Sequence, residues 1–142
     1  MKDPNDPCAD KFGDLELNQS QHDPEIRFSK KYVKISDIGP KSAGKQVRIR
    51  GRVHNSRQKG KNCFLNIRDT YDTMQCVLFT GEDPKISQGM VKYSGKIPNE
   101  SIVEIVGVPI KPDNEIKGST IQMELQVHEI WTVNKSASML PF

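Results

Sequence analysis

The feature that most constrains this chain is a run of residues in which apolar and basic side chains alternate one by one. An apolar set is Val47, Ile49, Gly51 and Val53, and the set between them is Arg48, Arg50, Arg52 and His54. A period of two is typical of a β-strand with one buried face. The glycine at position 51 indicates a bend or bulge, which lets one strand serve two sides of a small barrel.

Similar strand patterns return four times further along the chain. They cover residues 63–69, 73–79, 101–110 and 121–128. Between the third and fourth strands the pattern breaks, and Asp83 followed by Pro84 predicts the start of a short helix. Residues 57–62 form a basic, glycine-containing segment that we expect to be a turn.

An all-β chain of five strands, with one short helix between the third and fourth, has the element order of an OB-fold. This Greek-key barrel binds oligonucleotides on the face of its second and third strands. A five-stranded SH3-like barrel is the competing fold, and the position of the helix favours the OB-fold.

Length and composition limit the other classes of protein to which the chain can belong. The chain has 142 residues, enough for one domain with a modest core, and 27% of them are charged. No run approaches the roughly 20 apolar residues of a membrane-spanning helix, and no signal peptide is recognisable. Three widely spaced cysteines predict neither a disulfide framework nor a zinc site. We therefore expect a reduced, intracellular protein without a metal or membrane partner.

The formal net charge of +3 conceals two unlike regions. Residues 1–26 hold two lysines against seven acids, and the remainder holds 19 basic and 11 acidic residues. We expect residues 1–28 to be an acidic, disordered leader and residues 29–135 to form the barrel. A basic barrel suits a polyanionic partner, although many domains of this charge bind no nucleic acid.

The second and third strands predict a base-binding face. Pairing across their short turn places Asn66 opposite Gln75 and Phe64 opposite Val77, so Phe64 and Gln75 become diagonal neighbours on the outward face. An aromatic ring beside an amide, near basic residues, can stack on an exposed base. The alternative for Phe64 is a place in a second core, under the helix or a loop.

Basic and acidic residues complete the candidate site. Arg50, Arg52, Lys59 and Lys61 are the candidates for contacts to backbone phosphates. Arg57 and Gln58, which precede the second strand, are further candidates for nucleic-acid contacts. The alternative for Arg57 is a solvated charge in a turn. Glu124 on the fifth strand either accepts from a base amino group, as acids do with cytosine, or pairs with a neighbouring cation. No phosphate-binding glycine loop, serine elbow or metal-ligand pair predicts catalysis.

Several segments closely resemble the anticodon-binding domain of eukaryotic cytoplasmic aspartyl-tRNA synthetases. They are residues 52–61 (RVHNSRQKGK), 63–68 (CFLNIR), 74–78 (MQCVL), 90–93 (MVKY), 100–103 (ESIV) and 127–131 (VHEIW). The first strands alone also fit the lysyl and asparaginyl enzymes, whereas the later segments look specifically aspartyl-type.

The resemblance implies a domain that recognises the anticodon of tRNA-Asp. In that family a phenylalanine matching Phe64 stacks on the central uracil and a glutamine matching Gln75 hydrogen-bonds it. Residues matching Arg57 and Glu124 also contribute, the latter with a one-residue shift in register. The family's enzymes are class II homodimers that use ATP and magnesium. Because the class II motifs are absent, residues 136–142 are expected to begin a linker to a missing catalytic domain.

Overall fold

The structure is a computed structural model, and it describes residues 6–9, 11–14, 32–69, 71–82, 85–112, 116 and 119–134. The elements in chain order are β1 (Phe12–Asp14), η1 (Ile35–Asp37), η2 (Pro40–Ser42), β2 (Val47–Lys59), β3 (Asn62–Asp69), β4 (Asp72–Phe79), β5 (Gly81–Glu82), β6 (Lys85–Ile86), α3 (Gln88–Gly95), β7 (Ile102–Ile110) and β8 (Glu124–Asn134).

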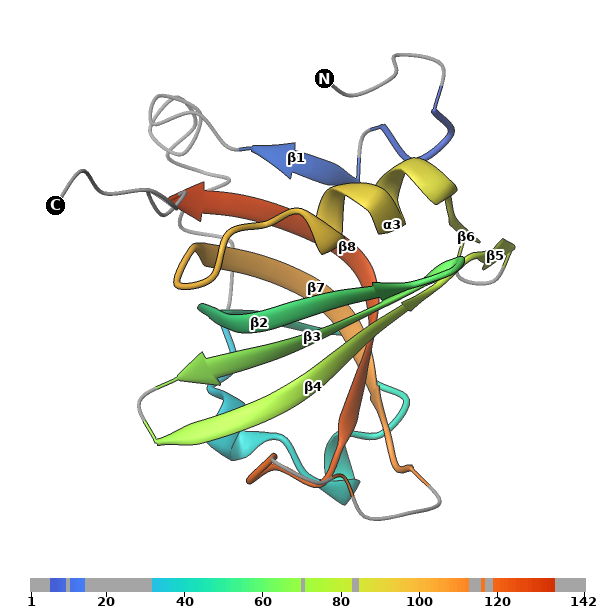
Figure 1. The fold of residues 1–142 in the computed structure, drawn as a ribbon. Coiled ribbons are helices and arrows are strands. Elements are labelled where there is room, and N and C mark those ends of the chain that lie inside the picture. The colour runs from blue at the N-terminus through green and yellow to red at the C-terminus, as the bar shows by residue number, and fades with distance from the viewer. Residues whose placement is uncertain are drawn as a thin grey trace, which may run out of the picture.

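Five of the strands close into a barrel. β2 pairs antiparallel with β3 on one side and with β7 on the other, and β3 pairs antiparallel with β4. β8 pairs parallel with β4 and antiparallel with β7, which completes the ring. Figure 1 shows these strands curving round one core, with α3 across one end. The predicted all-β OB-fold, with its helix between the third and fourth barrel strands, is therefore confirmed.

β2 is the long strand that serves two sides of the barrel. Residues 47–52 pair with β7, and the pairing with β3 begins at Arg52. At the crossing, a Cβ on Gly51 would lie 2.5 Å from Ile67 Cγ2 and 3.0 Å from the Arg68 carbonyl oxygen. The register shift lies between Val53 and Asn55, so the bulge follows Gly51, and the glycine itself permits the close approach.

The core follows the alternation of the strands. Most apolar side chains on the inward faces of all five barrel strands are buried, as are three residues of α3. Fully buried examples are Ile49, Leu65, Ile67, Leu78, Ile105, Leu125 and Ile130. Each such aliphatic side chain contributes about 1.5–3 kcal/mol on removal from water. The predicted inward faces of the first three barrel strands are confirmed.

The helix begins later than predicted. Ser87 is its N-cap, and the Ser87 Oγ accepts a hydrogen bond from the Met90 amide at 3.1 Å. Lys85 and Ile86 lie in β6 and pair with β5, so their backbone is already committed to an extended conformation. The prediction of an Asp83 cap is wrong for this helix, and Asp83 and Pro84 themselves lie outside the described residues.

Two strand boundaries also differ from the prediction. β2 continues to Lys59, so Arg57 lies on a strand, and the turn contracts to Gly60 and Lys61. Gly60 has φ +60°, which glycine adopts without steric cost. β8 begins at Glu124 and runs to Asn134, because its second half pairs with β7 beyond the predicted end.

Part of the acidic leader is folded. β1 pairs parallel with β8, and Figure 1 shows it beside β8 and α3. Cys8 and Phe12 are buried, and the Phe12 ring lies 5.3 Å from that of Tyr93. The prediction that this segment holds no packed element is wrong here, because β8 offers a free edge and α3 an apolar surface. Leader residues 1–5, 10 and 15–28, and residues 136–142, lie outside the described residues.

Candidate nucleic-acid interface

A row of four polar side chains crosses the outward face of four strands. Asn55 lies opposite Asn66, Asn66 opposite Gln75, and Gln75 opposite Glu124. The Asn66 Nδ2 donates to the Asn55 Oδ1 at 3.2 Å, and the Gln75 Nε2 donates to the Glu124 Oε2 at 2.9 Å. This polar row offers several hydrogen-bonding groups along one line of the barrel surface.

An aromatic pair lies beside the polar row. Phe64 is opposite Val77 in the register, as predicted, and its ring centroid is 5.9 Å from that of Phe79 at an interplanar angle of 83°. Phe79 is 40% exposed and Phe64 is partly buried, whereas Val77, opposite Phe64 in the register, is fully buried. The two rings therefore form an accessible apolar surface on which a flat base can stack.

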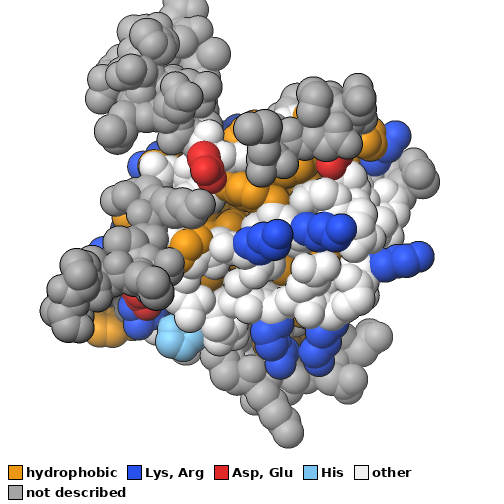
Figure 2. Space-filling view, turned by 45° about the horizontal axis from the view of Figure 1, so that its top comes forward, with side chains coloured by type: hydrophobic (Ala, Val, Ile, Leu, Met, Phe, Trp, Pro, Cys, Tyr) orange, Lys and Arg blue, Asp and Glu red, His pale blue; other side chains and the backbone are white. Residues whose placement is uncertain are grey.

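Cations stand at the edge of this face. Arg57 lies opposite Phe64 across the β2–β3 ladder, and Lys59 is two residues further along the same face of β2. Both are exposed, as is Lys61 in the turn, and within the described parts of the chain none of the three forms an ion pair. Figure 2 shows basic side chains around an exposed hydrophobic strip on one face of the molecule. Cations without protein partners are available to phosphates.

Three of the candidate residues lie apart from the aromatic pair. Gln58 is opposite Cys63 on the other face of β2, packs against Gly95 and donates to the Gly60 carbonyl at 3.3 Å. Arg52 lies opposite Arg68, four residues along β3 from Phe64, or about 13 Å at the rise of a strand. Arg50 lies further still, where β2 pairs with β7.

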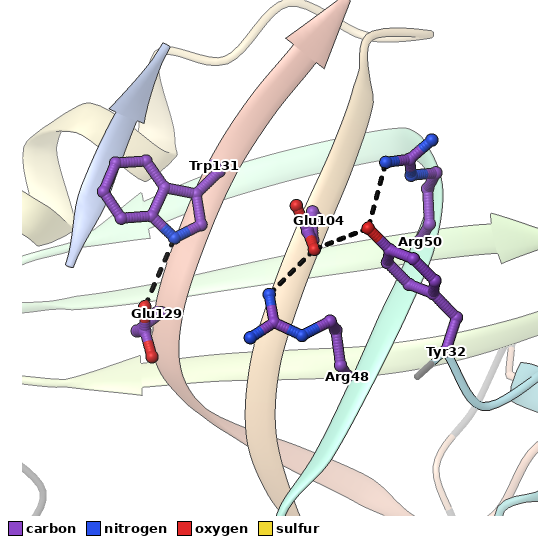
Figure 3. A network of polar contacts seen from close by, with 6 residues as sticks. All are labelled: Tyr32, Arg48, Arg50, Glu104, Glu129 and Trp131. Carbon is purple, nitrogen blue, oxygen red and sulfur yellow. Dashed lines mark hydrogen bonds and ion pairs between the residues drawn. The ribbon is translucent and has the colours of Figure 1, made fainter. Parts of the chain in front are cut away.

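A second polar cluster occupies that distant side of the barrel. The Glu104 Oε1 accepts from the Arg48 Nη1 at 2.8 Å and from the Tyr32 hydroxyl at 2.8 Å. Arg50 donates to the Tyr32 oxygen at 3.1 Å, and its guanidinium lies 4.9 Å from the centre of the Tyr32 ring. Figure 3 shows these side chains converging, with Trp131 donating to Glu129 nearby. Burial, reinforced by the Glu104 acceptor, raises the pKa of Tyr32.

The buried thiols contribute to packing. Desolvation raises the pKa of Cys63 to about 11, and it raises the pKa of Cys76 further, with the charge of Glu124 adding to the effect. Both groups are therefore protonated near neutral pH, when a thiol is a poor nucleophile and a poor metal ligand. Among the described residues, no group of histidine, cysteine and acidic side chains could hold a metal ion. The described helices include none long and apolar enough to cross a membrane.

The structure brings together Phe64, Gln75, Arg57 and Glu124, which sequence reasoning selected from separate strands. It adds Phe79 and Asn55 to the same face and confirms the predicted place of Asn66 opposite Gln75. A signal for Phe79 was present in the sequence, because it shares the period of Gln75 and Val77. The position of the bulge, which puts Asn55 opposite Asn66, left no such signal.

A closed five-stranded barrel with an aromatic and polar outward face, edged by exposed cations, defines an OB-fold of the nucleic-acid-binding class. The chain belongs to the tRNA anticodon family of OB-fold nucleic acid binding domains, which it matches over residues 47–133.

Relatives at the level of whole proteins agree with this family. The cytoplasmic aspartate–tRNA ligase 2 of Arabidopsis thaliana is 35% identical over 96% of this chain and 26% of its own length. The cytoplasmic aspartate–tRNA ligase of Caenorhabditis elegans is 36% identical over 98% of this chain and 25% of its own. The solved aspartyl-tRNA synthetase from Entamoeba histolytica superposes with a TM-score of 0.83 at 32% identity, covering 93% of this chain and 27% of that one. The resemblance to aspartyl enzymes is confirmed, and the chain spans about a quarter of the length of these relatives.

Proposed function

We propose that this chain recognises the anticodon loop of tRNA-Asp on the outward face of β3, β4 and β8. The observation that carries the proposal is the meeting of Phe64, Gln75 and Glu124 on neighbouring positions of one face. A stacking surface next to hydrogen-bonding groups suits a base that has left its own stack, as anticodon bases do.

In the proposed complex, Phe64 stacks on the central uracil and Gln75 hydrogen-bonds its edge. Arg57, Lys59 and Lys61 neutralise phosphates of the loop, and Arg50 and Arg52 add contacts further along β2. The Gln58 side chain lies on the other face of β2 from Arg57. Gln58 therefore contacts the loop only at the end of the β2–β3 hairpin. The polar row supplies sequence preference, whereas the cations supply affinity that is independent of sequence.

The activity named by the relatives is part of the same proposal. We propose that the protein serves aspartate–tRNA ligation in the cytoplasm, as a homodimer that uses ATP and magnesium. In this role the barrel selects the tRNA, and aspartate activation is assigned to none of its described residues.

The test is binding of tRNA-Asp transcripts that differ only at one anticodon base. We expect wild-type protein to prefer the aspartate anticodon, and Phe64→Ala to lose about 1–3 kcal/mol of binding free energy together with the preference at the central base. Tyr71→Ala is the matched control, because this tyrosine is 89% exposed in the turn region at the opposite end of the β3–β4 hairpin from Phe79.

Two other classes of protein predict different results. A general single-stranded nucleic-acid-binding OB protein binds every anticodon variant equally, and that outcome overturns the specific proposal. A protein-interaction OB module shows no RNA binding that weakens with salt, and that outcome overturns nucleic-acid binding altogether.

A further inference from the structure

The hydrogen bond between Gln75 and Glu124 determines which way the Gln75 amide points. A carboxylate oxygen accepts hydrogen bonds and donates none, so the Gln75 nitrogen, which donates at 2.9 Å, has to face Glu124 on β8. Glu124 is opposite Gln75 in the β4–β8 register, so the contact is built into the strand pairing. The amide oxygen of Gln75 is consequently turned away from β8.

The neighbouring amide reinforces this arrangement. The Asn66 nitrogen donates to the Asn55 oxygen on β2 at 3.2 Å. Within the described parts of the chain, neither the Asn66 oxygen nor the Gln75 oxygen accepts a hydrogen bond. An acceptor without a donor calls for a ligand group that donates a hydrogen.

Uracil and cytosine differ at the atom that such a position tests. N3 of uracil carries a hydrogen and donates, whereas N3 of cytosine carries a lone pair and accepts. An acceptor held opposite N3 bonds uracil and repels cytosine. A glutamine free to turn its amide over could satisfy either base, because its nitrogen and oxygen would exchange places.

We propose that Glu124 is a positioning residue that holds Gln75 as a hydrogen-bond acceptor, so that the site selects uracil over cytosine at the base stacked on Phe64. The inference rests on the proposed function and deepens it: Gln75 contacts the base, and Glu124 acts through Gln75. The device needs no movement of the backbone, since the amide is already oriented in the unliganded protein.

The test uses the 142-residue chain and tRNA-Asp transcripts with uracil or cytosine at the central anticodon position. The readout is the ratio of the two affinities in wild type, Glu124→Gln, Gln75→Ala and the double variant. A ratio is needed because removal of one negative charge strengthens binding to any polyanion. Glu129→Gln, on the same strand, is the control for charge.

We expect wild type to favour uracil by on the order of tenfold, the discrimination that a well-placed hydrogen-bonding pair provides. Glu124→Gln should remove most of that ratio, because a neutral amide at position 124 lets Gln75 turn over. In the Gln75→Ala background the same change should have no further effect on the ratio.

Three results would overturn the inference. If Glu124→Gln keeps the full ratio, Gln75 is not positioned by Glu124, and the proposed function still stands. If Glu124→Gln changes the ratio equally in the Gln75→Ala background, Glu124 acts on the base itself. If wild type binds both transcripts equally, the proposed function falls and the inference falls with it.

A second measurement needs no RNA and no variant. A hydrogen bond to the carboxylate slows exchange of the Gln75 side-chain amide hydrogens with solvent, and nuclear magnetic resonance can follow them. Gln126, two residues beyond Glu124 on β8, is the internal reference. Exchange at Gln75 as fast as at Gln126 would contradict the orientation that the inference requires.

Discussion

Before the bulge in β2, the outward arginines lie against acids and an aromatic ring, and after it the cations face open surface. Arg48 binds the buried Glu104, Arg50 lies over Tyr32, and Arg52 is 3.9 Å from Glu100. Arg57 and Lys59 lie on the same strand, but within the described residues they have no acidic partner. One strand thus carries basic residues that tie the barrel together and others that are available to a ligand.

The difference arises from the strands that flank each half. The first half of β2 pairs with β7, which places Glu104 beside the arginines. The second half pairs with β3, which places Phe64 beside the later cations. A basic alternation is therefore not in itself a nucleic-acid signature. Its meaning depends on whether the neighbouring strand supplies an acid or an aromatic ring.

The largest expected effect is a loss of stability when an ion pair in the first half of β2 is broken. Glu104→Gln should lower the free energy of unfolding by about 3 kcal/mol, near the lower limit for breaking a buried pair, since Arg48 remains partly exposed. Urea denaturation measures the loss. Glu100→Gln, whose side chain is 46% exposed, should cost less than about 1 kcal/mol. Equal losses would erase the distinction between buried and exposed pairs on this strand.

The crossing point between the halves comes next. Gly51→Ala should destabilise the protein by about 2 kcal/mol, because the new methyl group would overlap Ile67 and approach the Arg68 carbonyl. Gly39→Ala is the control, since no atom lies within 4 Å of a Cβ there. Thermal unfolding compares the two. A Gly51→Ala protein as stable as wild type would show that the crossing has room to spare.

A smaller effect should separate the cations by their role in binding. Lys59→Ala should reduce the salt dependence of tRNA affinity by about one counterion, as loss of a phosphate contact does. Arg52→Ala should reduce it less, because Arg52 already lies near Glu100. Binding measured over a range of salt concentrations gives both slopes, with Lys92→Ala on α3 as the control. Equal slopes for Lys59→Ala and Arg52→Ala would contradict the comparison.

The smallest effect concerns the tyrosine of the first half. Tyr32→Phe should cost about 0.5–1 kcal/mol, the net value of an ordinary hydrogen bond at a partly exposed site. The pKa of Tyr32 is raised in the folded protein, so the neutral phenol is favoured. Its contribution is complete below a pH of about 10 and is lost as the pH rises through the folded pKa. Unfolding measured at alkaline pH should therefore show a steeper decline in wild type than in the variant, in which the raised pKa values of Cys63, Cys76 and Tyr93 still lower the stability.

The barrel and much of the arrangement of side chains on its candidate face could be predicted because both depend on local periodicity. Alternation alone identified the inward residues of β2, β3 and β4, and the short turn near Tyr71 set the register that makes Phe64 and Gln75 neighbours. The role of the buried acid was harder to predict from the sequence. Glu104 interrupts an apolar run, which is a signal, but its partner Tyr32 is 72 residues away in sequence.

Other features could not be predicted because they arise from contacts distant in sequence. The position of the bulge decides that Arg57 and Lys59 share the face of Asn55, and a strand pattern is compatible with several positions for it. β1 forms because β8 offers it an edge, although its own three residues carry too little apolar surface to predict a strand.

By itself, the sequence determined an all-β barrel with a helix before its fourth strand, and a basic, aromatic face on the second and third strands. Periodicity and short turns depend on residues that are close together in the chain, so they can be recognised in the amino-acid sequence. Only the tertiary structure decided which cations of β2 have an acidic partner among the described residues and which way the Gln75 amide points. Both depend on a partner strand that comes much later in the chain: β7 for β2, and β8 for β4. Across the first pairing the physical effect is an ion pair, and across the second it is a hydrogen bond.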